Sequence, residues 1–310
     1  APRFYKSQNR AVTEDDYTAA VIKEYPNADS VYVYGGETVV PPQYGKVFIA
    51  VKPKSGSALT TDEKISLARV LRENRSVVTV TPEIVDADYI DLVIDSIVTY
   101  DPNLASIGAG TIKALLVAYA FTYSATALET FGANFYLSQL SQGMNSVSAS
   151  ILSNQTTVSL RKTVNLAKLV ASKGFAIDFK NPLLHPHEGH SPVLGSSIIS
   201  HKNTDGVIVN DVYATDDGYG KINLVTTDAN GSQSTVYPNI GAVDYANGTV
   251  KFNTAFAPTS ASTLFTITVQ PENTDIFVFE NKILRMSRGY ADSVSISLQS
   301  QVSRKQNLKG

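Results

Sequence analysis

Cysteine and tryptophan are both absent from this chain of 310 residues. The lack of cysteine excludes disulfide bonds, thiolate metal sites and cysteine nucleophiles together. Neither sign of charge is in excess, because 26 lysines and arginines stand against 28 aspartates and glutamates. No long-range field draws such a chain to nucleic acid or to an anionic membrane, so we expect neither as a partner. A mass of 33.4 kDa is enough for two domains.

Long hydrophobic runs are scarce as well. Only residues 109–128, in which Lys113 is the sole charge, approach the roughly 20 apolar residues that a membrane span needs. Hydroxyl and small side chains interrupt the run, so it predicts a buried helix rather than a span. A helix that is apolar on nearly every side has to be covered all round, either in the interior or at a subunit interface. The residues of this helix proposed for an interface are Leu115, Leu116, Tyr119 and Tyr123.

Start signals for two helices lie in the first quarter of the chain. Thr13 precedes three acids, which is a hydroxyl cap before an acidic first turn, and predicts a helix to about Glu24. Thr60 and Glu63 form a capping box that opens a second helix, ending near Asn74. The inner face of that helix is predicted to carry Ile65, Ala68 and Leu71.

Strand patterns lie between and after these helices. The expected strands cover residues 31–35, 46–51 and 88–100. The last of these alternates, which predicts one buried face and one partly wet face. The residues expected on its buried face are Ile90, Leu92, Ile94 and Val98.

The order of these elements predicts the architecture of the first half. Two strands, a helix and a further strand are typical of a ferredoxin-like sandwich of sheet and helices. A helix pair at about 111–128 and 132–141 follows, and then a strand at 156–162. Residues 1–172 are therefore predicted to form an N-terminal α/β domain, with a leading helix segment in residues 1–25.

From about residue 173 the chain consists of strand-like segments and tight turns. Asn247-Gly248 is the strongest hairpin signal, between segments 242–245 and 249–252. Further strands are expected at 206–214, 221–227, 264–269, 276–279 and 283–286. This pattern predicts a mainly β domain, a sandwich or a barrel, over residues 173–310. The fold class expected for the whole chain is α+β.

No complete catalytic or cofactor-binding signature is present in the sequence. The best metal candidate is the loop that carries His185, His187 and His190, with Glu188 or His201 as further ligands. Proline and glycine make this loop irregular, so no helix or strand fixes the spacing of its ligands. A solvated loop or an interface loop is the simpler interpretation, and we expect no metal and no other cofactor.

Two further patterns resemble sites only superficially. Asp91 and Asp95 share a strand face but lie about 13 Å apart at ~3.3 Å per residue, too far for one ion or a glycosidase pair. A solvated sheet face is expected there. The segment 108–110 lacks the third glycine of a dinucleotide fingerprint, because Lys113 stands in its place. Its glycines are expected to let a helix start in a crowded place. No enzymatic activity is predicted.

An ordered series of short motifs runs through the chain. Arg-Ala-Val-Thr-Glu-Asp-Asp-Tyr occupies 10–17, a glycine-led strand occupies 45–51, and a capped helix follows Thr60. Later, Ile-Gly-Ala-Val-Asp-Tyr at 240–245 precedes the turn at 247–248. In this order the motifs resemble the baseplate-J-like family of contractile-tailed bacteriophages, and the later motif resembles a turn of its T4-like baseplate wedge members. The resemblance covers most of the chain and corresponds to the C-terminal portion of a wedge protein.

The resemblance implies a structural role without a catalytic site. Members of the family are dimer-forming parts of the tail baseplate that contact other wedge proteins in a ring around a central hub. It implies a homodimer, located in the tail baseplate of the virion and in the host cytoplasm during assembly. The baseplate of the family rearranges during infection, so hinges are expected near Pro102 and at residues 172–174.

Two alternatives remain open from the sequence. One is a carbohydrate-binding or adhesion module of a phage tail. Its stacking residues would be Tyr213, Tyr219, Tyr237 and Tyr245. The other is a metal-dependent hydrolase built on the histidine loop. Aromatic side chains in β domains more often form cross-strand pairs or core, which favours the structural role.

Overall fold

The structure is a computed structural model in which seven segments of the chain are described. These are residues 10–39, 41–74, 80–169, 174–202, 208–228, 230–253 and 263–302. Contacts divide the chain into two compact units. Unit 1 comprises Ala1–Tyr89, Ala127–Ala133 and Val278–Leu284, and unit 2 comprises Ile90–Thr126, Asn134–Phe277 and Arg285–Gly310. The domain boundary expected at residue 172 was placed where the sequence changes to strands and turns, and not by contacts between residues. That boundary stays a prediction.

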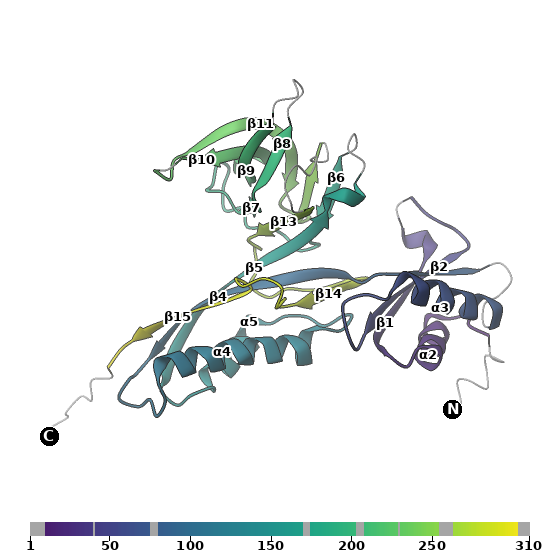
Figure 1. Cartoon of the computed structure of the whole chain (residues 1–310), viewed down its shortest axis with the longest axis horizontal. Coiled ribbons are helices and arrows are strands. Elements are labelled where there is room, and N and C mark those ends of the chain that lie inside the picture. Colours follow the sequence, from purple (N-terminus) through teal and green to yellow (C-terminus); the bar gives the residue numbers. More distant parts are fainter. Residues whose placement is uncertain are drawn as a thin grey trace. The chain divides into compact units, whose positions relative to one another are not determined.

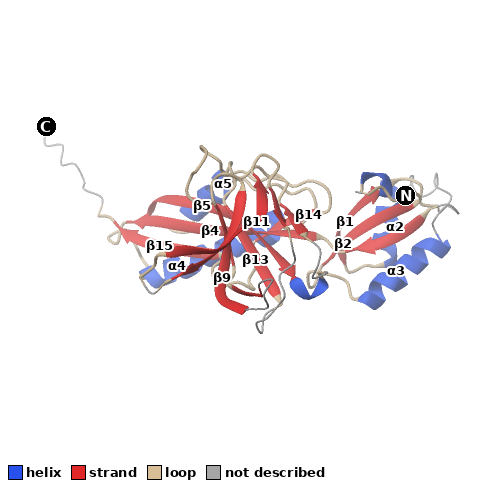
Figure 2. Ribbon diagram, turned by 90° about the horizontal axis from the view of Figure 1, so that it is seen from above, coloured by secondary structure: helices blue, strands red, loops and turns tan. Residues whose placement is uncertain are grey.

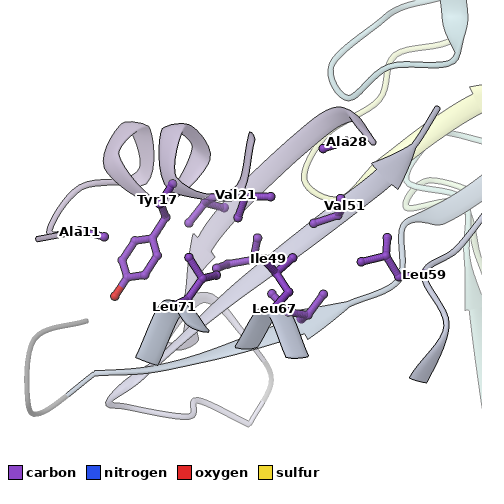
Figure 3. Close-up of a cluster of buried hydrophobic side chains, with 12 residues drawn as sticks. Ala11, Tyr17, Val21, Ala28, Ile49, Val51, Leu59, Leu67 and Leu71 are labelled. Carbon is purple, nitrogen blue, oxygen red and sulfur yellow. The ribbon is translucent and has the colours of Figure 1, made fainter. Parts of the chain in front are cut away.

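Unit 1 contains a three-stranded sheet and two helices. In chain order these elements are α2 (Glu14–Glu24), β1 (Ala28–Gly35), the short η1 (Gly36–Thr38), β2 (Lys46–Pro53), α3 (Thr61–Asn74) and β3 (Thr81–Val85). The strand order is β1-β2-β3, with β1 and β2 antiparallel and β2 and β3 parallel. Figure 3 shows the core of this unit, where Tyr17 and Val21 of α2 and Leu71 of α3 surround Ile49 of β2.

Both predicted helix starts of unit 1 are confirmed. Thr13 caps α2 in a capping box with Asp16. Thr60 accepts the N–H of Glu63 through Oγ1, while the Glu63 carboxylate accepts the N–H of Thr60 at 2.8 Å. The predicted inner face of α3 is wrong at Ile65, which is 63% exposed. Six residues at 100° each place Ile65 about 120° away from the buried Leu71, whereas Leu67 lies one turn from it.

The third strand of the small sheet was not predicted. It is β3, and the long strand at 88–100 is not part of this sheet. β3 has five residues and contains Pro82, a residue that argues against a central strand. Proline is tolerated here because β3 is an edge strand that pairs only with β2 in the small sheet.

Unit 2 is built on a large sheet with two helices. Its helical elements are α4 (Ala109–Tyr123), which continues as the π-helical turn η2 (Ser124–Leu128), α5 (Leu137–Asn145) and η3 (Leu166–Lys168). The strands of unit 2 are β4 (Asp88–Tyr100), β5 (Ile151–Asn165), β6 (Phe175–Asp178), β7 (Leu194–Ser196), β8 (Ile199–Lys202), β9 (Ile208–Asp216), β10 (Lys221–Thr227), β11 (Gln233–Asp244), β12 (Thr249–Phe252), β13 (Leu264–Val269) and β15 (Val294–Ser300). Most of β14 (Lys282–Arg285) belongs to unit 1.

The order of strands in the large sheet brings distant segments together. From β4 it runs β4-β5-β13-β7-β9-β10-β11-β12-β6, while β15 pairs with β4 and β8 pairs with β9. The strands β6 to β13 gather in a group of their own, coloured from teal to yellow-green in Figure 1. The long β5 pairs with β4 through its first part and with β13 through its second. The α+β fold class with a mainly β C-terminal region is confirmed.

The predicted hairpins of the second half are present. β9 and β10 form one, and β11 and β12 form another around Gly248, whose φ of 65° suits glycine. The strand predicted at 276–279 is wrong, because Ile276 makes only an isolated bridge with Phe135. The second helix of the predicted pair starts five residues late, at Leu137, where the backbone N–H is accepted by Asp275.

Candidate interaction surface

The strands β15, β4 and β5 form the framework of the candidate surface. β15 runs parallel to β4, from Val294 opposite Ile94 to Ser300 opposite Tyr100. β5 pairs with the other side of β4 in antiparallel orientation. α4 packs against β15 and α5 against β5, and both helices lie below the strands in Figure 1. The predicted buried face of β4 is confirmed, since Ile90, Leu92, Ile94 and Val98 are all 0% exposed.

Helix α4 is apolar on nearly every side, but the fold covers only one stripe of it. The buried stripe consists of Ile112, Leu116 and Ala120, each four residues from the next. Of the most apolar 18-residue window in Ala109–Leu128, only 28% is buried. By length and composition alone this helix could cross a membrane, a test that core helices of other proteins also pass. Unit 2 therefore displays more apolar helix surface than its own core uses.

The four predicted interface residues of α4 have different surroundings. Leu115 is 43% exposed, and Leu116 is 0% exposed in the core. Tyr119 and Tyr123 are half-buried and stacked at 6.5 Å, and the Tyr123 ring also meets Phe135 edge-on at 6.3 Å. Burial raises the pKa of Tyr123. Of the four, only Leu115 is thus an exposed residue.

Tyr119 also fixes the spacing between α4 and α5. A Cβ atom added to Gly143 of α5 would lie 1.6 Å from the Tyr119 hydroxyl, so only glycine fits there without movement of the ring. At the C-terminal end of α4, the Ser124 hydroxyl accepts the N–H of Met286 at 2.8 Å, and Arg288 lies 4.3 Å above the Phe121 ring. These contacts hold the helix in place from two sides.

The two glycines at the start of α4 do not relieve crowding, so that prediction is wrong. A Cβ at Gly108 or Gly110 would meet nothing within 4 Å. Gly108 is the N-cap of the helix, with an extended backbone at φ −65° and ψ 152° and no side-chain cap. The helix begins in open space, so these glycines provide no enclosed cradle for a phosphate.

The histidine rings of the loop pack against one another and against Tyr245. In the described part of the chain, no group of three or more His, Cys, Asp or Glu residues is placed to hold an ion. His185 and His190 meet edge-on at 4.9 Å, and His187 lies 6.4 Å from His190. The His190 ring is buried, with Nδ1 2.7 Å from the Ser191 carbonyl oxygen and no partner for Nε2. Ring contacts therefore account for the packing of this loop, and the absence of a metal stays a prediction.

A buried carboxylate next to this loop joins three segments of unit 2. Asp216 accepts the N–H groups of Val193 and Leu194 at 2.8 and 2.9 Å through Oδ1, and the Tyr245 hydroxyl at 2.7 Å through Oδ2. Burial and then the hydrogen bond to Asp216 raise the pKa of Tyr245. The face of the Tyr245 ring is covered by His185 at 4.4 Å. Tyr245 is therefore a packing residue rather than an exposed platform for sugars.

One aspartate of β4 is buried in an ion pair. Asp91 is 3% exposed and accepts a hydrogen bond from Arg285 at 2.6 Å, so the expected solvation of this residue is wrong. Asp95 on the same face is exposed, as expected. The sequence does not reveal this ion pair, because Arg285 lies 194 residues along the chain from Asp91.

A second long-range ion pair was not foreseen from the sequence. Arg161 of β5 is 5% exposed, and its guanidinium donates to both carboxylate oxygens of Asp292. The same guanidinium lies 4.9 Å over the Tyr290 ring, and Nε donates to Thr268. Arg161 lowers the pKa of Asp292. No local pattern marks this pair, because the two partners are 131 residues apart.

Two kinds of feature stand out among the described residues. Asp91, Arg161 and Asp216 are buried in hydrogen bonds and ion pairs, and apolar surface stays exposed on α4. Exposed apolar surface of this kind commonly marks an interaction site.

Comparisons with known proteins find a family model that matches part of the chain. Residues 13–85 match the family model described as baseplate structural protein gp6, C-terminal domain I. The baseplate wedge protein gp6 of Enterobacteria phage T4 is 23% identical over 159 residues, which is 51% of this chain and 24% of that protein. The chain thus spans about a quarter of the length of this curated relative. The resemblance to the C-terminal portion of T4-like baseplate wedge proteins, given by the sequence motifs, is confirmed.

A solved structure with partial likeness is the cryo-EM structure of the anti-feeding prophage baseplate, 6-fold symmetrised. The match has a TM-score of 0.40 and 14% sequence identity, and it covers 51% of this chain and 35% of that chain. The assignment therefore depends on the two sequence comparisons. They do not favour the carbohydrate-binding alternative.

Proposed function

We propose that this chain is a structural subunit of the baseplate of a contractile phage tail, working through contacts between subunits rather than through catalysis. The observation that carries the proposal is the match of residues 13–85 to the gp6 family model. Those residues span the elements α2 to β3 of unit 1. The proposed location is the tail baseplate of the virion, reached after synthesis in the host cytoplasm.

The proposal includes a homodimer that uses the region around α4. The exposed Leu115 and the low coverage of the helix support this part. Surplus apolar surface on a subunit commonly marks an interface. A stable dimer is expected to bury about 1,200–2,000 Å² in total, more than one helix face provides, so neighbouring elements have to contribute.

The proposed partners are other baseplate wedge proteins, in a ring around a central hub that rearranges during infection. Movement between parts of the chain is expected near Pro102, two residues after the end of β4. The second expected hinge, at residues 172–174, falls largely outside the described residues.

Labelling of phage tails tests the location. Antibodies raised against the purified chain are expected to decorate the baseplate end of tails that encode it, in negative-stain electron microscopy. Antibodies first absorbed with the purified chain serve as the control and should leave the tails bare. Label confined to the sheath or to the capsid would contradict the proposal.

Sedimentation velocity tests the dimer separately. The purified chain is expected to sediment as a dimer between low and high micromolar concentration. A strict monomer at high micromolar concentration would remove the dimer from the proposal, and the baseplate location would still stand on the labelling result.

A further inference from the structure

Strand β15 lies at the margin of its sheet. It pairs with β4 along its whole length of seven residues, from Val294 to Ser300. Among the described residues no strand pairs with its other side, and Figure 2 shows β15 along the border of the sheet. The row of backbone groups on that side is available to another chain.

The hydrogen bonds to β4 reveal which backbone groups face outward. Ser293 accepts the N–H of Ile94 at 2.9 Å, and Gln301 donates its N–H to Tyr100 at 2.9 Å. Successive residues of a strand turn their N–H and C=O groups to opposite sides, so the odd-numbered residues of β15 face β4. The backbone N–H and C=O groups that point away from β4 therefore belong to Val294, Ile296, Leu298 and Ser300.

This edge lacks the devices that normally protect one. Its sequence, Val-Ser-Ile-Ser-Leu-Gln-Ser, contains no charged residue and no proline, and its register with β4 has no bulge. Edge strands of monomeric proteins usually carry lysine, proline or a bulge. The edge strand β3 of unit 1 follows that rule, with Pro82 and with Glu83 in an ion pair with Lys46.

We propose that β15 pairs in antiparallel orientation with β15 of a second copy of this chain, about a two-fold axis. The inference rests on the proposed homodimer and names its strand contact. An uncharged strand can lie against its own copy without like charges meeting, whereas it has nothing to attract a charged partner strand. α4 packs against β15, so its exposed apolar surface lies in the same region of unit 2.

The register of the paired strands follows from their length. Pairing all seven residues sets Ser297 opposite its own copy, with Ser295 opposite Gln299 and Ile296 opposite Leu298. The outward groups of the even-numbered residues then form about eight backbone hydrogen bonds across the axis. Ser297 occupies a pair without hydrogen bonds, where Cα atoms lie about 4.5 Å apart. The sheet continues through the dimer, and the exposed serines meet on its wet face.

Engineered cysteines test this register in the full chain, which has no cysteine of its own. S297C is expected to form a disulfide-linked dimer under mild oxidation, because its Cα separation across the axis suits a disulfide. S295C is the matched control, an exposed serine on the same face of the same strand. Its two copies would lie about 13 Å apart, so it should stay uncrosslinked alone. The double variant S295C/Q299C should crosslink.

Charge exchange provides a second test that requires no crosslink. S297K and S297E are each expected to sediment as monomers with unchanged far-UV circular dichroism, and an equal mixture of the two is expected to restore the dimer. Q155K and Q155E on β5 provide the control, since Gln155 is an exposed residue two strands away in the same row. They should remain dimeric when measured separately.

Each result has a defined meaning. A wild-type dimer that survives both Ser297 charges, or single variants that stay monomeric when mixed, would overturn the strand pairing and leave the dimer proposal standing. If Q155K and Q155E were each monomeric and formed a dimer only when mixed, the contact would involve β5 and the pairing of β15 would be overturned. A monomeric wild type would overturn the proposed dimer and this inference together, and the labelling result would then show whether the baseplate location still holds.

Discussion

The capping boxes of unit 1 and the buried polar contacts of unit 2 differ in how far apart their partners lie in the sequence. In unit 1, two capping boxes begin the helices, and each joins residues that are three positions apart. In unit 2, buried polar side chains connect residues that are tens to hundreds of positions apart, as Asp216 does with Tyr245 and Asp91 with Arg285. Local contacts leave a mark in the sequence, and long-range contacts do not. The difference teaches where sequence patterns suffice and where only the folded chain reveals the partner.

The largest expected loss of stability comes from Leu116 of α4 in unit 2, and its neighbour Leu115 serves as the comparison. L116A is expected to destabilise the protein by about 2–5 kcal/mol, because it leaves a cavity in the core. L115A should cost less than about 1 kcal/mol, since 43% of the Leu115 side chain is already exposed. Urea unfolding followed by circular dichroism measures both. Equal losses would mean that α4 is covered on both sides within one chain.

That pair also shows how far the sequence predicts the helix. Apolar composition predicted α4 and its surplus of hydrophobic surface, but the choice between Leu115 and Leu116 depends on which stripe meets β15. A helix with no polar face offers no rotational signal, because its hydrophobic periodicity is nearly flat. α3 has such a signal, and even there the stripe was misplaced at Ile65.

The elements of the fold were more predictable than its contacts. The alternation of β4 and the turn at Asn247-Gly248 are local patterns, and the structure has both. Of the candidate surface, the sequence predicted the apolar helix α4 and not the strands that lie beside it. The role of the β15 edge could not be predicted, because an uncharged strand becomes an edge only through its place in the sheet order.

The second prediction breaks a long-range polar contact of unit 2. Y245F is expected to cost about 1–3 kcal/mol, because the buried Oδ2 of Asp216 loses a hydrogen-bond donor. Thermal or urea unfolding at neutral pH measures the loss. Y219F is the matched control, because Tyr219 is 67% exposed and should give little change.

The same variant tests a pH dependence. The pKa of Tyr245 is raised above its ordinary value of 10.0, so its contribution to stability is fully present below about pH 10 and is lost as the pH rises further. Unfolding free energies measured between pH 8 and 11 should therefore fall less steeply for Y245F than for wild type. Identical slopes for the two proteins would contradict the assigned hydrogen bond.

The third prediction concerns the packing of α4 on α5. G143A is expected to destabilise unit 2 by about 1–2 kcal/mol, because the added methyl group meets the Tyr119 ring. In a Y119A background the same change should become neutral or stabilising, since alanine is the better helix former by up to about 1 kcal/mol. A double-mutant cycle by urea unfolding measures this reversal. Additive effects would show that the ring is not the obstacle.

The smallest expected effect returns to the local contacts of unit 1. T60A removes the hydroxyl that caps α3 and should cost about 1 kcal/mol. T61A, one residue later and exposed in the first turn, is the control and should be nearly neutral. Hydrogen bonds from Thr60 lower the pKa of Glu63 below its usual 4.5, so this contribution is present above that pH and is lost as the pH falls. The difference between T60A and wild type, measured by urea unfolding, should therefore shrink between pH 6 and pH 3. A difference in unfolding free energy that stays constant with pH would assign the loss to helix propensity instead of the capping box. It would also weaken the contrast between the local capping boxes of unit 1 and the long-range polar contacts of unit 2.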